Sequence, residues 1–299
     1  MYELIIIGGG PAAITAAIYA ARKKIKTLIL AKSFGGQMLE SYLIDNYPGL
    51  PALPGVKLME KFVEHLKQYE KATSKGDFDL AMKEGEAAQS ISQESQTFLL
   101  KTDRAAYSAR AVIIATGKTE RKLEIPGAAD FEGKGITYCA TCDAPIFRDK
   151  VVAVIGGGDS GQDTALQLLD YASKIYILSR YEDLKGSNRE LQEKLKNNPK
   201  IEILKETEPK EIFGEKFVKG MICKNLKSRE EKKIEVSGIF VEIGSIPSAN
   251  FIDGLIKRNE KGEIIVDHNS GATSCFGIFA AGDVTDISAK QIVVAAGEG

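Results

Sequence analysis

The sequence has no tryptophan, only two histidines and only four cysteines among its 299 residues. Four cysteines are too few for structural disulfides to stabilise a chain of this length. Lys and Arg number 40 against 41 Asp and Glu, and the resulting net charge of -1 disfavours nucleic acid or an anionic membrane as the main partner. We expect about two domains from the length. We also expect a cytoplasmic protein, because in a reducing compartment a disulfide is more often catalytic than structural.

The uncharged residues 4–21 superficially resemble a signal or membrane segment. No basic region precedes them, and a Gly-Gly-Gly-Pro run divides them into two different patterns. Residues 3–7 are mainly Leu and Ile, as in a strand buried on both faces of a parallel sheet. Residues 12–21 are small and suit a helix. The stretch therefore predicts a strand, a glycine turn and a helix.

This pattern occurs twice, with glycine runs that start at Gly8 and Gly156, 148 residues apart. In the second copy, residues 151–155 form the strand and a helix begins within residues 163–170. Further buried strands are expected at residues 27–30, 112–115, 175–178, 239–243, 264–266 and 278–281. Residues 71–97 have little pattern and suit a peripheral hairpin and loop. The two copies predict an α/β protein with two Rossmann-like dinucleotide-binding domains.

The order of these strands places the second domain inside the sequence of the first. Strand character typical of the first domain returns near the end of the chain and leads into Gly282-Asp283. The first domain is then expected at residues 1–118 and 249–299, and the inserted domain at residues 119–248. The two crossings would lie near residues 118–122 and 245–248.

Each glycine run has the form of a dinucleotide fingerprint. The first glycine permits a tight turn, the second lets backbone N–H groups approach a pyrophosphate, and the third small residue lets the helix pack on the strand. These residues are Gly8, Gly10 and Ala13 in the first run and Gly156, Gly158 and Gly161 in the second. Ordinary tight turns can have similar glycine-rich sequences. Two such runs, each between a strand and a helix, nevertheless predict two dinucleotide sites.

Neither copy has the acidic residue that binds a ribose about 20 positions further on. The first copy has Ala31 and Lys32 there, and the second has Ser179 and Arg180. With no carboxylate to repel it, a 2′-phosphate fits Ser179 and Arg180, which favours NADPH over NADH. Alternatively, Arg180 is a solvated charge that follows a strand.

A C-x-x-C motif, Cys139 and Cys142, lies between the two fingerprints, with Asp143 directly behind it. Two thiols this close can form a disulfide, and a thiolate can attack another disulfide, so the motif predicts a redox pair. Asp143 is placed to carry the protons of thiol–disulfide exchange, although a helix N-cap is the alternative. Zinc would need two more ligands, and no metal site is expected. The other candidate ligands lack metal-type spacing: His65, His268, Cys223 and Cys275.

Taken together, these motifs resemble those of the low-molecular-weight thioredoxin reductase family. They occur in the family's order over nearly the whole chain: Gly8 to Ala13, Phe34-Gly35-Gly36-Gln37, Asn46-Tyr47-Pro48-Gly49, Ala115-Thr116-Gly117, Cys139 to Asp143, Gly156 to Gly161, Gly244-x-x-Pro247 and Ala280-Ala281-Gly282-Asp283. The later part, residues 238–241 through 296–299, is also similar to the flavoprotein component of alkyl hydroperoxide reductase. That component carries an extra N-terminal dithiol domain, which this sequence does not contain.

The resemblance implies a flavoprotein with an FAD-binding domain at residues 1–118 and 249–299 and an NAD(P)H-binding domain at residues 119–248. It implies that Cys142 takes electrons from the flavin, Cys139 attacks the disulfide of thioredoxin or a similar protein, and Asp143 manages the proton. It also implies a homodimer and a rotation of the inserted domain, because the dithiol and the nicotinamide must reach one flavin in turn.

The resemblance further implies the residues that contact each cofactor. Those expected at FAD are Gly8, Gly10, Pro11, Ala12, Ala13, Gly35, Gly36, Gln37, Asn46, Thr116, Gly117, Gly282, Asp283, Lys290, Gln291 and Ile292. Asp283 would bind the ribityl chain, and Gln291 would face the flavin ring. Those expected at NAD(P)H are Gly156, Gly158, Asp159, Ser160, Gly161, Ser179, Arg180, Tyr181, Lys185, Ile243 and Gly244.

The leading hypothesis is an FAD-dependent thioredoxin-disulfide reductase driven by NAD(P)H. The segment Ser179-Arg180-Tyr181, followed by Lys185, replaces the family's His-Arg-Arg and further Arg, and so leaves the electron donor open. One alternative is an NADH-dependent flavoprotein reductase for a peroxiredoxin or glutaredoxin-like partner. Two others are a flavin redox sensor that signals through the dithiol and a reductase with a non-nicotinamide donor.

Overall fold

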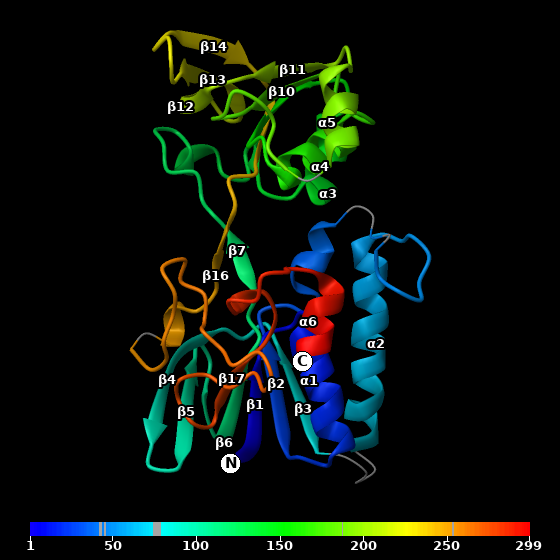
Figure 1. The fold of residues 1–299 in the computed structure, drawn as a ribbon, viewed down its shortest axis with the longest axis vertical. Helices are drawn as coiled ribbons and strands as arrows, with labels where there is room; N and C mark the ends of the chain where they lie inside the picture. The colour runs from blue at the N-terminus through cyan, green and yellow to red at the C-terminus, as the bar shows by residue number, and fades with distance from the viewer. Residues whose placement is uncertain (42–43, 45, 74–78, 187, 253) are drawn as a thin grey trace. The chain divides into compact units, whose positions relative to one another are not determined.

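The computed structural model describes residues 1–41, 44, 46–73, 79–186, 188–252 and 254–299 (Figure 1). The chain forms two compact units, one of Met1–Thr119 with Ile246–Gly299 and the other of Glu120–Ser245. We call them the outer unit and the inserted unit, because the second interrupts the sequence of the first, as predicted. Two short strands that pair with each other carry the chain between the units: β7 (Lys118–Glu120) and β16 (Ser245–Pro247).

The outer unit is built on a seven-stranded sheet with the order β3-β2-β1-β6-β5-β4 and β17 beside β6. Its strands are β1 (Tyr2–Ile7), β2 (Thr27–Ala31), β3 (Leu80–Glu84), β4 (Ala88–Glu94), β5 (Thr97–Thr102), β6 (Ala106–Ile114) and β17 (Ile278–Ala280). Strands β1, β2, β3, β6 and β17 pair in parallel, whereas β4, β5 and β6 are antiparallel.

Both faces of this sheet are covered, which explains the unbroken Leu and Ile run of β1. Ile6 points into a core shared with the helices, and Ile5 and Ile7 point into a core on the opposite face. Figure 1 shows α1 and α2 on the helical face. The helical elements are α1 (Pro11–Arg22), η1 (Gly36–Glu40), α2 (Gly55–Thr73), η4 (Asn250–Ile252), η5 (Gly282–Val284) and α6 (Ile292–Glu298). None of the helices in the described ranges is long and apolar enough to cross a bilayer.

The inserted unit is built on a five-stranded parallel sheet with the order β11-β10-β9-β15-β8, next to a three-stranded antiparallel sheet. Its strands are β8 (Ile136–Thr137), β9 (Val151–Ile155), β10 (Lys174–Leu178), β11 (Ile201–Leu204), β12 (Thr207–Gly214), β13 (Val218–Asn225), β14 (Glu231–Glu235) and β15 (Gly238–Val241). Its helical elements are η2 (Ala129–Phe131), α3 (Ala140–Asp143), η3 (Ala144–Phe147), α4 (Asp159–Leu168) and α5 (Arg189–Lys196).

Three sequence expectations need correction. Helix α4 begins at Asp159, not within residues 163–170, because Asp and Ser suit the first turn of a helix. Residues 264–266 form no strand, and Ile264 makes only isolated bridges to Arg258 and Thr285. Residues 71–97 include residues 74–78, which lie outside the described residues. Beyond those, β3 joins the parallel sheet, and only β4 and β5 form the expected hairpin.

Candidate redox site and dinucleotide crevices

The first glycine of each fingerprint holds a backbone conformation that other residues rarely adopt. Gly8 has a φ of +133° and Gly156 a φ of +132°. A Cβ at either position would lie 2.1 Å from a carbonyl oxygen of the neighbouring strand end, that of Ala115 or that of Glu242. Both turns therefore require glycine.

The second glycine of each fingerprint faces open space. No heavy atom lies within 4 Å of a Cβ built on Gly10 or Gly158. These glycines are the N-caps of α1 and α4, and neither cap has a side-chain hydrogen bond to the first helical amides. Uncapped amides at a helix start beside an open backbone suit a pyrophosphate, so the residues present fit a dinucleotide in each unit.

The third small residue differs between the two units. Ala13 is fully buried, so the outer turn has room for one methyl group. A Cβ on Gly161 would lie 2.0 Å from the carbonyl oxygen of Gly156, so the inserted turn has none. Helix α4 therefore approaches its strand more closely than a methyl group would allow.

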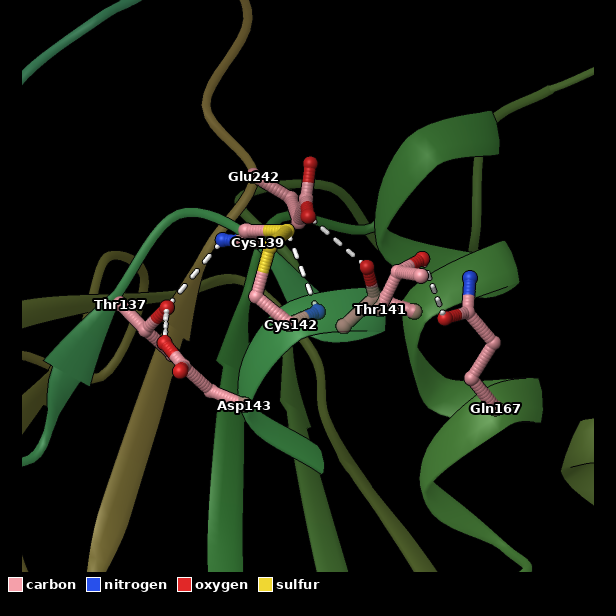
Figure 2. The surroundings of a disulfide bond; sticks show 8 residues. Thr137, Cys139, Thr141, Cys142, Asp143, Gln167 and Glu242 are labelled. Carbon is pink, nitrogen blue, oxygen red and sulfur yellow. Dashed lines mark hydrogen bonds between the residues drawn. A yellow bond between two sulfur atoms is a disulfide. The ribbon is translucent and has the colours of Figure 1, made fainter. Parts of the chain in front are cut away.

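The predicted dithiol forms a disulfide between Cys139 and Cys142, with their Cα atoms 5.4 Å apart. Cys139 is the N-cap of α3, and its sulfur accepts a hydrogen bond of 3.2 Å from the Cys142 amide (Figure 2). Cys142 is exposed, whereas Cys139 is half-buried. In the reduced state the same amide would stabilise a Cys139 thiolate, because hydrogen bonds to the charged form favour it.

A threonine hydroxyl connects Asp143 to the dithiol. Thr137 donates its hydroxyl hydrogen to the Asp143 carboxylate, and the same oxygen accepts a 3.2 Å hydrogen bond from the Cys139 amide (Figure 2). Asp143 is also the N-cap of η3, but its side chain makes no capping hydrogen bond. The geometry thus favours a carboxylate held beside the cysteines over the N-cap alternative.

Glu242 follows β15 and lies at the inserted fingerprint. Its carboxylate accepts a 2.7 Å hydrogen bond from the buried hydroxyl of Thr164, on α4. Burial, with a smaller effect of the nearby acids Glu120 and Asp163, raises the pKa of Glu242 from 4.5 to about 7, against the opposite effect of the Thr164 hydrogen bond. Figure 2 includes Glu242 among the surroundings of the disulfide.

The structure brings several residues expected at FAD together in the outer unit. The Gly35 amide donates a 2.7 Å hydrogen bond to the Gly9 carbonyl, and a Cβ on Gly36 would lie 3.3 Å from the Gly10 Cα atom. The Asn46 side chain donates a 3.1 Å hydrogen bond to Gln291, across 245 positions of sequence. Gln37 follows in η1, and Ile292 begins α6 directly after its N-cap, Gln291.

The Gly282-Asp283 turn is held from two sides. The Gly282 amide donates a 2.7 Å hydrogen bond to the Glu298 carboxylate. Lys290 donates a 3.3 Å hydrogen bond to the Asp283 carbonyl and contacts the Glu263 carboxylate at 3.2 Å. Burial raises the pKa of the Asp283 carboxyl, against the opposite effect of Lys290 and Lys118.

The Glu263 carboxylate joins this turn to the first crossing strand. Lys118 lies 3.1 Å from it, on β7. Burial opposes ionisation of Glu263, but hydrogen bonds from Asn259 and the two lysines outweigh it and hold the pKa at about 2. Just before Lys118, the Thr116 hydroxyl donates a 2.7 Å hydrogen bond to the Ser248 carbonyl, and Gly117 has a φ of +65°.

The region after β10 differs from the expected phosphate site. Ser179 is fully buried, its hydroxyl donates to the Asp183 carbonyl at 3.2 Å, and the same oxygen accepts from the Tyr181 amide. A Cβ on Gly157 would lie 2.7 Å from that oxygen, so Ser179 packs beneath the glycine turn and is not positioned to contact a phosphate. Arg180 is exposed and lies 3.5 Å from Glu208.

The other residues expected at NAD(P)H belong to the same inserted unit. The Lys185 ammonium lies 5.3 Å from the centre of the exposed Tyr181 ring. Asp159 and Ser160 form the exposed first turn of α4. Ile243 is half-buried, and the Gly244 carbonyl accepts a 2.8 Å hydrogen bond from the Arg121 amide.

Sequence reasoning missed four polar residues of these sites: Thr137, Thr164, Glu242 and Glu298. The threonines carry no sequence signal, because their partners come from other elements. Glu242 did carry a sequence signal, because a carboxylate directly after a buried strand of a parallel sheet lies at the ligand-binding edge. Glu298 had none.

The fold and these sites define a flavoprotein-type disulfide oxidoreductase with two Rossmann-type units. The family model for "pyridine nucleotide-disulphide oxidoreductase" matches residues 2–299, and the chain belongs to this family. Membership implies FAD and a nicotinamide dinucleotide in general.

The relatives carry mixed names. The chain is 37% identical over 298 residues to a Bacillus subtilis protein named NADH dehydrogenase. It is also 37% identical over 300 residues to a subunit of alkyl hydroperoxide reductase from Pseudomonas putida. All of this chain is covered in each case but only 56% of the relative, so the chain spans about half the length of these curated proteins. A solved Lactococcus lactis thioredoxin reductase is 35% identical with a TM-score of 0.90, and the match covers 100% of this chain and 95% of that one.

Substituting the first and second glycines of the inserted fingerprint separates folding from binding. Gly156→Ala should destabilise the protein by on the order of 3 kcal/mol, because it combines an unfavourable φ with a backbone clash. Gly158→Ala should keep the thermal midpoint within a few degrees and weaken dinucleotide binding by about tenfold or more, because the methyl group fills the approach to the pyrophosphate. Thermal unfolding and titration calorimetry measure both effects. Equal destabilisation by the two substitutions would contradict this assignment.

The raised pKa of Glu242 makes stability depend on pH. Between the unfolded and folded pKa values of Glu242 the folded state binds more protons, so the contribution of this group to stability is largest below about pH 4.5 and is lost as the pH rises through about 7. In wild type, Glu242 should lower the free energy of unfolding by on the order of 2 kcal/mol between about pH 5 and about pH 8.5, and Glu242→Gln should abolish this decrease. Urea unfolding at the two pH values measures the difference. Glu211→Gln, which removes an exposed carboxylate on β12, should leave the pH dependence unchanged. An identical pH dependence in wild type and Glu242→Gln would refute the assignment.

Proposed function

We propose that this chain is a thioredoxin-disulfide reductase that passes electrons from NAD(P)H through FAD to the Cys139–Cys142 disulfide and on to thioredoxin. One observation carries the proposal: a disulfide lies in the same unit as a glycine fingerprint turn, in a chain that matches a solved thioredoxin reductase over 95% of that chain's length. A homodimer is part of the proposal. Thioredoxin is proposed as the substrate because it is the substrate of that solved reductase.

FAD is proposed to bind in the outer unit and NAD(P)H in the inserted unit. The flavin, when bound, supplies two-electron chemistry between a nicotinamide and a disulfide. The uncapped amides at the start of α1 would hold its pyrophosphate, and Asn46 and Gln291 would orient each other at the start of α6. The uncapped amides of α4 would hold the pyrophosphate of the nicotinamide dinucleotide.

The dithiol would carry two electrons and two protons. Reduction breaks the S–S bond and gives two thiols, and the Cys139 thiolate attacks one sulfur of the partner disulfide to form a mixed disulfide. Cys142 then attacks Cys139, which restores the internal disulfide and releases the reduced partner. The Cys142 amide stabilises the Cys139 thiolate, and Asp143, fixed by Thr137, carries a proton.

A second candidate is an NADH-dependent reductase for a peroxiredoxin or glutaredoxin-like partner. The 37% identity to a component of alkyl hydroperoxide reductase favours it. The buried Ser179 hydroxyl, and the pairing of Arg180 with Glu208, also weaken the case for a 2′-phosphate site.

Cysteine substitutions test the proposed electron path. Cys142→Ser should leave anaerobic flavin reduction by the nicotinamide intact and lower disulfide reductase turnover by at least about a hundredfold, because the serine cannot form the internal disulfide. Cys139→Ser should behave in the same way. Cys275→Ser, at a partly exposed cysteine outside the motif, should retain full turnover. Full turnover in Cys142→Ser would eliminate the assigned role.

Donor and partner are decided by separate titrations. If the donor is NADPH, NADPH should bleach the flavin band under anaerobic conditions at lower concentration than NADH, and Arg180→Ala should weaken NADPH binding about tenfold while leaving NADH binding unchanged. Steady-state turnover is then compared with thioredoxin, a glutaredoxin-like protein and a peroxiredoxin. Preference for NADH together with turnover of peroxiredoxin alone would establish the second candidate. Bound FAD that neither nucleotide bleaches would exclude both.

A further inference from the structure

The sheet of the inserted unit has a topological switch point. Strand β9 has β10 on one side and β15 on the other. Dinucleotides bind across the crevice at such a point, outside the carboxyl ends of the strands. The ribose next to adenine is recognised by residues after the second strand, here β10, so the nicotinamide half extends towards β15.

Glu242 directly follows β15 and packs on the glycine turn. Its amide donates a 2.8 Å hydrogen bond to the Ile155 carbonyl, at the end of β9. A Cβ built on Gly156 would lie 3.2 Å from the Cβ of Glu242, and one built on Gly161 would lie 3.6 Å from it. Glu242 therefore packs directly against the turn that would receive the dinucleotide.

The carboxyl group of Glu242 is held in an acidic and partly buried setting. The Thr164 hydroxyl on α4 donates to it at 2.7 Å. The charged groups that act on it are acidic, namely Asp163 on α4 and Glu120 on β7. The nearby cysteines, Cys142 on α3 and its N-cap Cys139, are uncharged as a disulfide. Burial and these two acids bring its pKa to about 7, so it changes charge near neutral pH.

Resting on the nicotinamide-dependent function above, we propose that Glu242 distinguishes the oxidised from the reduced nicotinamide by charge. The oxidised ring is a cation and the reduced ring is neutral, whereas the rest of the dinucleotide is the same in both. As a carboxylate, Glu242 attracts the cationic ring. As a neutral acid, it no longer favours one ring over the other.

The sign of the pH dependence follows from linkage. A nearby cation favours the ionised carboxyl, so binding of the oxidised dinucleotide lowers the pKa of Glu242 and releases protons. The affinity of the oxidised form relative to the reduced form must then rise as the pH increases through about 7. A shift of one pKa unit corresponds to about a tenfold rise in that ratio.

The test is titration calorimetry on the FAD-loaded protein at about pH 5.5 and about pH 8.5. The probes are the oxidised dinucleotide and its tetrahydronicotinamide derivative, which has a neutral ring and cannot transfer hydride. In wild type, the affinity ratio of oxidised to neutral probe should rise about tenfold between the two pH values. In Glu242→Gln the ratio should be independent of pH, and in Glu211→Gln it should follow wild type.

Proton release gives a second readout that needs no variant. Calorimetry at about pH 7 in two buffers of different ionisation enthalpy should show proton release when wild type binds the oxidised probe, and much less with the neutral probe. If both probes bind but the ratio stays constant with pH, or stays pH-dependent in Glu242→Gln, the inference is wrong while the proposed function stands. If neither probe binds wild type, the nicotinamide-dependent function and the inference both fail.

Discussion

The glycine turn pressed against a neighbouring strand end is the constraint on which both sites depend. At Gly8 and at Gly156 the backbone passes so close to a carbonyl oxygen that a methyl group cannot fit. Each turn leads directly into a helix, and the glycine at the N-cap of that helix faces open space. In the inserted unit the residue that presses on the turn is Glu242, so the turn that receives a ligand also positions a titratable carboxyl.

Each unit contains a partly buried glutamate, and the two glutamates have pKa values shifted in opposite directions. Glu263 in the outer unit has two lysines and an asparagine around it, and these hold its pKa at about 2 despite burial. Glu242 in the inserted unit has a single threonine hydroxyl, and the charges near it are acidic, so its pKa rises to about 7. The same side chain is thus a permanent anion in one unit and changes charge near neutral pH in the other.

The sequence was most informative where a local pattern determines the structure. Strand β9 was predicted with its observed bounds, and the paired fingerprints correctly indicated two Rossmann-type units with one inserted. Strands β12 to β14 were not anticipated, because their pairing depends on contacts between strands and on no motif. Ser179 was expected to bind a phosphate because a serine hydroxyl suits that role. Its side chain lies beneath Gly157 instead, a position that only three-dimensional packing determines. The Asn46–Gln291 contact likewise joins positions too distant for local patterns.

The discontinuous outer sheet has a consequence for the order in which the protein is made. Strand β17 completes that sheet by pairing with β6, yet the whole inserted unit, Glu120–Ser245, is translated between them. A ribosome releases the chain from its N-terminus, so the inserted unit can collapse onto its own core while the outer unit still lacks one strand and α6. During that interval only the end of β6 that pairs with β17, Val112 to Ile114, lacks its partner strand on that side and is open to association with other chains. Chaperone dependence and aggregation of nascent chains should therefore concentrate in the outer unit.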